Sequence, residues 1–165
     1  MESAHGMTQD DIIAFVTGLP GAVATTAREG DGSPEVAWGD TFIFHSADGT
    51  AATAQRMPFA TIVTKDYDGF DTASDLNRPG VFRLNINVGS AAFADLLGYP
   101  PAAHADHAAG VDPTATDRVI AHPMYAAQGW VAILNPAEAT TAQARALLTA
   151  AHARASARAA RTRRH

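Results

Sequence analysis

The sequence predicts an α+β domain of two layers, in which an antiparallel sheet carries its helices on one face. The clearest evidence is the strict alternation of apolar and polar side chains over residues 81–88, the period-two pattern of a half-buried strand. Short links with turn residues, such as Asp48-Gly49, separate other apolar runs and favour antiparallel pairing. Helical periodicity occurs near both ends of the chain and once between strands, so the expected order is α-β-β-β-α-β(β)-α.

The chain of 165 residues is long enough for one domain with its own core, which we expect to span residues 8–153. Residues 154–165 are expected to form a basic helix end or tail. Hydrophobic residues make up 47% and charged residues 18%, as in a soluble globular protein, and no apolar run approaches the roughly 20 residues of a membrane span. The lack of cysteine and of an apolar N-terminal segment favours a cytoplasmic protein without membrane contact.

The formal net charge of −5 is unevenly distributed, because five of the twelve basic residues lie in the last twelve positions. Residues 1–153 therefore have a net charge of −10. Such a body repels a phosphate backbone, which excludes nucleic-acid binding by the folded part. The arginine-rich end is either a solvated helix end or a recognition arm.

The predicted helices have recognisable starts and stops. Candidate N-caps precede the helical patterns, at Thr8, Ser90, Asp112, and Thr140 or Thr141. The first helix ends at Pro20-Gly21 and the second at Gly98. The third is expected to reach residue 120, with His122-Pro123 beyond it, and the last shows an apolar stripe of alanine and leucine.

The remaining segments are expected to be strands or loops. Strands are predicted over residues 22–26, 36–45, 59–64, 81–88 and 130–134, with a short paired piece near 124–127. Gly39-Asp40 interrupts the second of these as a bulge. Residues 102–111 show little periodicity and are expected to form an exposed loop.

Three long stretches, residues 34–44, 58–89 and 122–140, resemble a family of actinobacterial proteins known as domain of unknown function 6194. The resemblance extends from about Asp10 to His152. The element order also resembles the YjbR-like fold, which type III secretion chaperones share. These resemblances imply a free-standing cytoplasmic domain and supply no catalytic residue.

The strand over residues 81–88 and the loop before it form the first candidate site. Arg83, Asn85 and Asn87 share one face of this strand, which is either the solvated side of the sheet or the lining of a pocket. In a pocket they would orient a polar or anionic ligand, because the arginine fork suits carboxylate or phosphate. Lys65, at the end of the neighbouring run, could reach the same region.

His122 and Tyr125 are candidates for a general acid–base pair, because histidine titrates near neutrality and tyrosine donates a hydrogen bond. In the alternative interpretation His122 only caps a helix end. Trp38 and Trp130 are either core aromatics or pocket lining. The predicted catalytic residues are thus His122, Tyr125 and Lys65, and the predicted ligand-binding residues are Arg83, Asn85, Asn87, Trp38 and Trp130.

The sequence predicts no metal site and no cofactor. The acidic loop at residues 66–75 has Phe70, Asp71 and Asn77 where an EF-hand needs an oxygen ligand, glycine and glutamate. His104 and His107 lack the HExxH arrangement of zinc enzymes. A phosphate-binding loop, a dinucleotide glycine pattern and a serine nucleophile motif are also absent.

Two functions remain open. The protein either binds or converts a polar or anionic small molecule, through cofactor-independent acid–base chemistry of the isomerase, cyclase or lyase type if it is an enzyme. Alternatively it is an interaction module, chaperone-like or homodimeric, without catalytic activity. A deep pocket would favour the first, and a flat apolar surface would favour the second.

Overall fold

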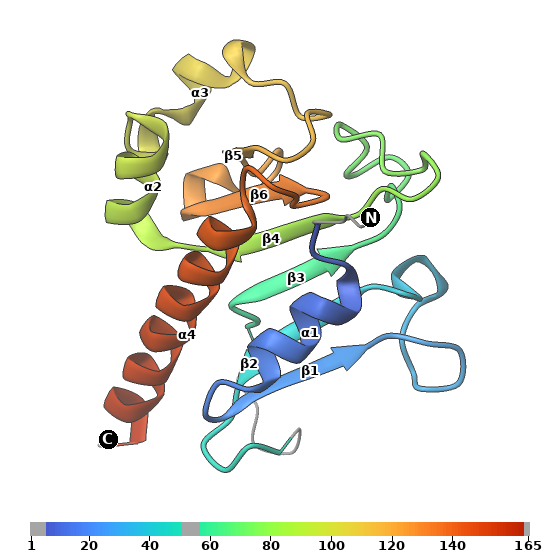
Figure 1. Cartoon of the computed structure of the whole chain (residues 1–165), viewed down its shortest axis with the longest axis vertical. Helices are drawn as coiled ribbons and strands as arrows, with labels where there is room; N and C mark the ends of the chain where they lie inside the picture. Colours follow the sequence, from blue (N-terminus) through green and yellow to red (C-terminus); the bar gives the residue numbers. More distant parts are fainter. Residues whose placement is uncertain (1–5, 51–56, 164–165) are drawn as a thin grey trace.

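The computed structural model describes residues 6–50 and 57–163 and contains one six-stranded sheet (Figure 1). Every neighbouring pair of strands is antiparallel, and the spatial order is β1-β2-β3-β4-β6-β5. The strands are β1 (Ala22–Thr26), β2 (Thr41–His45), β3 (Ala60–Val63), β4 (Arg83–Asn87), β5 (Val119–Ala121) and β6 (Trp130–Leu134).

The longer helices pack on one face of this sheet and confirm the predicted α+β class. They are α1 (Gln9–Thr17), α2 (Gly89–Leu97) and α4 (Thr141–Arg163). Their buried side chains share one core with the inward side chains of the strands, exemplified by Val16, Phe93 and Leu148 against Leu84 and Ile133. In the part of the chain that the structure describes, no helix combines the length and apolar character needed to cross a membrane.

The first helix begins as predicted, whereas the N-cap of the second lies two residues before the predicted Ser90. Thr8 and Asp11 form a capping box, in which each side chain accepts from the other residue's backbone N–H at 3.0 Å. The N-cap of α2 is Val88, because the N–H groups of Val88 and Gly89 both donate to the carbonyl of Gly129 and turn the chain directly from strand to helix. Gly98 ends α2 in the left-handed conformation, as expected.

The strand predicted over residues 36–45 is shorter than expected and begins at Thr41. Glu35–Ala37 forms a 3₁₀ turn after Pro34. Asp40 is fully buried, and its carboxylate accepts the backbone N–H and the hydroxyl of Thr64 at 2.8 and 2.9 Å. This tertiary contact fixes the bend before the strand.

The helix predicted over residues 112–120 does not form. Asp112 instead closes a short turn by accepting the N–H and hydroxyl of Thr114 at 3.0 and 2.7 Å. Asp117 follows in the left-handed region, at φ 54°, and the chain then pairs with β6 as the edge strand β5. Tertiary pairing therefore overrides the local helix signal.

Two further assignments are corrected between the second helix and β6. Residues 102–111, predicted as a loop, lie in short helical turns: Pro101–Ala103 (3₁₀), α3 (His104–His107) and Ala108–Gly110 (3₁₀). The piece near 124–127, predicted as a strand, leads into another 3₁₀ turn, Ala126–Gln128. Pro123 lacks an N–H for pairing, and the next two N–H groups are bound by the His122 side chain.

One end of the helix-free face of the sheet is covered by a loop. There the loop after β3 packs Leu76 onto a second apolar cluster with Val63, Ile120, Ala132 and Leu134. This arrangement leaves the neighbouring part of the same face to the candidate site.

The last helix continues through residues that were expected to be a basic end or tail. Its last fully buried side chain in the described part is Ala155, which is 2% exposed. Arg154 donates to the carbonyl of Asn87 at 3.1 Å, and its guanidinium packs on Gly89, where an added Cβ would lie 2.7 Å from Cζ. The beginning of the basic segment therefore takes part in the fold.

Candidate functional site

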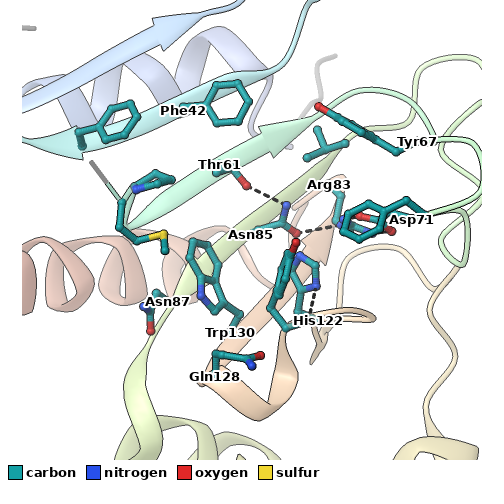
Figure 2. A pocket seen from close by; sticks show the side chains of 16 residues that line it. Phe42, Thr61, Tyr67, Asp71, Arg83, Asn85, Asn87, His122, Gln128 and Trp130 are labelled. Carbon is teal, nitrogen blue, oxygen red and sulfur yellow. Dashed lines mark hydrogen bonds and ion pairs between the residues drawn. The ribbon is translucent and has the colours of Figure 1, made fainter. Parts of the chain in front are cut away.

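A cavity of about 640 Å³ opens on the sheet face opposite the helices (Figure 2). The strands supply its floor, and the loop after β3 and the turn between β5 and β6 supply its sides. The lining residues are Phe42, Phe44, Met57, Pro58, Thr61, Val63, Tyr67, Phe70, Asp71, Arg83, Asn85, Asn87, His122, Tyr125, Gln128 and Trp130.

Strand alternation and register create the polar floor. On β4, Leu84 and Ile86 enter the helix-side core, so Arg83, Asn85 and Asn87 face the cavity. Arg83 is 0% and Asn85 2% exposed, so this face is not the solvated side of the sheet.

A loop aspartate neutralises the buried arginine. Asp71 binds the Arg83 guanidinium with both oxygens, at 2.5 Å from Nη2 and 3.2 Å from Nη1. Nη1 also donates to the Ser74 hydroxyl at 3.0 Å, and Nε donates to Asn85 Oδ1 at 2.8 Å. The positive charge that suggested an anionic ligand is therefore already paired within the chain.

Asn85 connects this ion pair to the next strand. Its Oδ1 is occupied by Arg83, so Nδ2 points the other way and donates to Thr61 Oγ1 at 2.9 Å (Figure 2). Thr61 and Asn85 are register partners on β3 and β4. This chain of bonds fixes the side chains of Arg83, Asn85 and Thr61 across the cavity floor.

His122 is buried and neutral. Its Nδ1 accepts the backbone N–H groups of Met124 and Tyr125 at 3.0 and 3.1 Å, so in the neutral ring the proton lies on Nε2. Burial, aided by the nearby Arg83 and opposed by Asp71, lowers the pKa of His122 to about 3. The side chain caps a turn by accepting N–H groups, whereas the alternative interpretation expected a cap at a helix end.

Aromatic rings surround His122. Tyr125 lies with its ring centroid 5.0 Å from that of His122, and Trp130 meets the histidine edge-on at 6.3 Å. Trp130 is 9% exposed, whereas Tyr125 is 42% exposed and lies at the rim. The cavity thus combines aromatic walls with a polar floor.

Two of the eight sequence-predicted site residues do not line this cavity. The Lys65 ammonium donates to the carbonyl of Trp38 and lies 3.6 Å from a carboxylate oxygen of Asp40. The Tyr67 hydroxyl donates to the same carboxylate, and burial raises the pKa of this tyrosine above its usual range. Trp38 is half-buried and donates from Nε1 to the carbonyl of Ser33. Lys65 and Trp38 therefore belong to a structural network around Asp40.

The other six predicted residues are brought together, along with lining residues that sequence reasoning missed. The missed set includes Phe42, Phe44, Thr61, Tyr67, Phe70 and Gln128. Alternation did place Phe42 and Phe44 on one side of their strand. Alternation alone does not say whether that side of β2 shares a sheet face with Asn85. The strand register decides it, because Phe42 pairs with Thr61 and Thr61 pairs with Asn85.

Several of the residues weighed as metal ligands have other partners. Asp66 accepts the N–H of Leu76 at 2.8 Å, and His104 bonds the Tyr99 hydroxyl at 2.9 Å. His107 stacks on the Tyr99 ring at 3.9 Å. Within residues 6–50 and 57–163, no three side chains of His, Asp or Glu are grouped as ion ligands.

The architecture defines an α+β protein with one open antiparallel sheet, helices on one face and a cavity on the other. Residues 7–164 match the model of a family of unknown function, DUF6194, and the chain belongs to that family. No curated protein and no solved structure matches the chain.

Proposed function

We propose that this protein binds an uncharged, largely aromatic small molecule in the cavity on the open face of its sheet. The observation that carries the proposal is the combination of a formed cavity, aromatic walls and a buried, hydrogen-bonded polar floor. Ligand sites typically occupy about 300–1,000 Å³ and combine apolar lining with a few fixed polar groups. The cavity of about 640 Å³ has both features.

Exposed apolar side chains at the rim support the proposal. Met57, Phe70 and Tyr125 line the cavity and are 63%, 55% and 42% exposed. Large exposed hydrophobic residues gathered at one place are a usual sign of a binding surface. A bound aromatic molecule would cover part of these side chains.

The chemistry of the floor favours binding over acid–base conversion. Arg83 and Asp71 cancel each other's charge, and His122 is neutral with its Nδ1 occupied. A neutral imidazole that holds its only proton on Nε2 acts as a hydrogen-bond donor. The alternative hypothesis, an interaction module of the YjbR-like kind, does not explain this cavity. That alternative becomes the better hypothesis if no small molecule binds.

Trp130 provides an intrinsic probe for the test. The chain has two tryptophans, and a Trp38→Phe variant leaves only Trp130, which lines the cavity. We expect members of a library of small uncharged aromatic compounds to change its emission saturably and to raise Tm.

A matched pair of variants shows whether the cavity is responsible. Gln128→Phe adds a bulky side chain to the lining, whereas Gln143→Phe makes the same change on an exposed position of α4. Gln128→Phe should weaken binding and Gln143→Phe should not. Absence of binding across the library, or equal affinity in both variants, contradicts the proposal.

A further inference from the structure

His122 presents a hydrogen-bond donor to the cavity. Its Nδ1 is occupied by two backbone N–H groups, which leaves the ring proton on Nε2. Among the residues that the structure describes, Nε2 has no hydrogen-bond partner, and it is not sealed from solvent either. A group that enters the cavity can therefore accept from it.

Asn85 and Thr61 supply further donors. The bond from Arg83 Nε to Asn85 Oδ1 fixes which end of the amide is the donor. The amide group has two hydrogens, and only one is used in the bond to Thr61 Oγ1. The hydroxyl of Thr61 accepts in that bond and retains its own hydrogen to donate.

The acceptors of the same floor each hold a hydrogen bond within the chain. Both oxygens of Asp71 bind Arg83, Asn85 Oδ1 binds Arg83 as well, and Asn87 Oδ1 lies 3.5 Å from its donor, Arg154 Nη1. A ligand that reaches the floor thus finds more unused donor hydrogens than acceptors that lack a hydrogen bond. Its own polar group should be an acceptor, since an unmatched donor on the ligand would lose its hydration without compensation.

The charge of that acceptor is set by its surroundings. Arg83 and Asp71 form a closed pair, and the neutral ring of His122 adds no charge. A carboxylate would lose much of its hydration in this apolar cavity without gaining an unpaired cation. A carbonyl oxygen accepts the same hydrogen bonds at a smaller desolvation cost.

From these contacts we infer that the cavity selects an uncharged aromatic compound with a carbonyl-type oxygen, which accepts from His122 Nε2 and Asn85 Nδ2. The inference rests on the proposed function and specifies the class of ligand. The aromatic part lies against the rings of Trp130, Tyr125 and Phe42, which line the same cavity.

Four probes of similar shape test the inference: acetophenone, benzoate, benzamidine and toluene. Their affinities are measured by ligand-observed NMR and by Trp130 emission in the Trp38→Phe protein. We expect acetophenone, whose only polar group is a carbonyl oxygen, to bind more tightly than the two ions and than toluene, which lacks the acceptor. This ranking of affinities is measured with every residue of the cavity floor unchanged, so it needs no variant of the floor.

His122→Asn then removes the donor while keeping the turn. The Asn Oδ1 occupies the place of Nδ1 and can accept from Met124 and Tyr125, while the shorter side chain leaves no N–H at the position of Nε2. Acetophenone affinity should fall about three- to tenfold more than toluene affinity, the difference that one neutral hydrogen bond usually makes.

The outcomes separate this inference from the proposed function. If none of the four compounds and no library member binds, the proposed function fails. If toluene or benzoate binds as well as acetophenone, or if His122→Asn weakens toluene and acetophenone equally, the cavity binds ligands but the carbonyl inference is wrong.

Discussion

The behaviour of His122 follows from two properties of its position, burial and an acceptor role at Nδ1. It is 3% exposed, and protonating Nδ1 would break both backbone hydrogen bonds. Burial is the main cause that lowers its pKa to about 3, and Arg83 adds to the effect. A residue type that usually titrates near neutrality thus stays neutral over the physiological range.

This depressed pKa predicts a pH dependence of stability. A histidine in the unfolded chain binds a proton near pH 6.5, whereas His122 in the folded protein does so only near pH 3. Between these values the unfolded state holds the extra proton, so the free energy of unfolding falls as the pH falls, by up to about 1.4 kcal/mol per pH unit. Urea denaturation at pH 7, 6 and 5 should therefore show a smaller loss in His122→Asn than in the wild type. An equal loss of unfolding free energy in the two proteins would contradict the lowered pKa of His122 in the folded state.

Asn85 shows what sequence reasoning could and could not supply at this scale. The alternation of residues 81–88 correctly assigns Arg83, Asn85 and Asn87 to one face. Whether that face is solvated depends on Phe42, Tyr125 and the loop after β3, which approach only when the chain is folded. The pairing of Arg83 with Asp71 likewise needs the loop conformation, so the sequence analysis expected a polar or anionic ligand at Arg83 instead.

Among the elements, the loop between β3 and β4 is held in position by several contacts with the rest of the fold. Leu76 packs under it, and Asp71 ties it to Arg83 on the floor. The backbone of Tyr67 and Asp71 also closes on itself, with N–H to carbonyl distances of 2.9 and 2.8 Å. The loop is therefore a fixed wall of the cavity, and the Asp71–Arg83 ion pair is its anchor on the floor.

Removing that anchor should be costly. Asp71→Asn leaves the Arg83 guanidinium buried without a counter-charge, so we expect a loss of about 3–5 kcal/mol in the free energy of unfolding. The matched control is Asp75→Asn in the same loop, whose carboxylate is 62% exposed and lies 3.8 Å from Arg78 Nε. That change should cost at most about 1 kcal/mol. Chemical denaturation measures both, and similar costs would mean that the Arg83–Asp71 pair contributes no more than a surface contact.

The C-terminal helix provides a second test at this scale. Deleting residues 159–165 removes no side chain that the described structure buries, so Tm should change by no more than a few degrees. Deleting residues 154–165 also removes Ala155 and the bond from Arg154 to Asn87, and should lower Tm by roughly 2–10 °C. Calorimetry of the two truncated proteins distinguishes them. If both deletions lower Tm equally, the packed part of α4 does not end near Ala155.

Strong local patterns predicted the elements well, and long-range contacts explain the errors. Strands β1, β4 and β6 lie within the predicted segments because alternating or continuous apolar residues suit a buried sheet. The segment after Asp112 has a helix start signal, yet pairing with β6 makes it a strand. The bend before β2 depends on Asp40 bonding Thr64, twenty-four residues further along the chain.

At the scale of the whole molecule, the sheet separates two kinds of residue. Its helix-side face carries the main apolar core, which includes Ile62, Ile86 and Val131. The adjacent residues of the same strands, Thr61, Asn87 and Trp130, lie on the opposite face and line the cavity. Neighbouring residues in the sequence thus serve different layers of the molecule.

The consequence of this two-faced sheet concerns how such a protein can change over evolutionary time. Substitutions at the cavity-facing positions of β3 and β4, such as Thr61 and Asn87, alter the shape and polarity of the cavity without entering the helix-packed core. New specificity can therefore arise through single exchanges that the scaffold tolerates. The exceptions are Arg83 and Asp71, which have to change together because each neutralises the other.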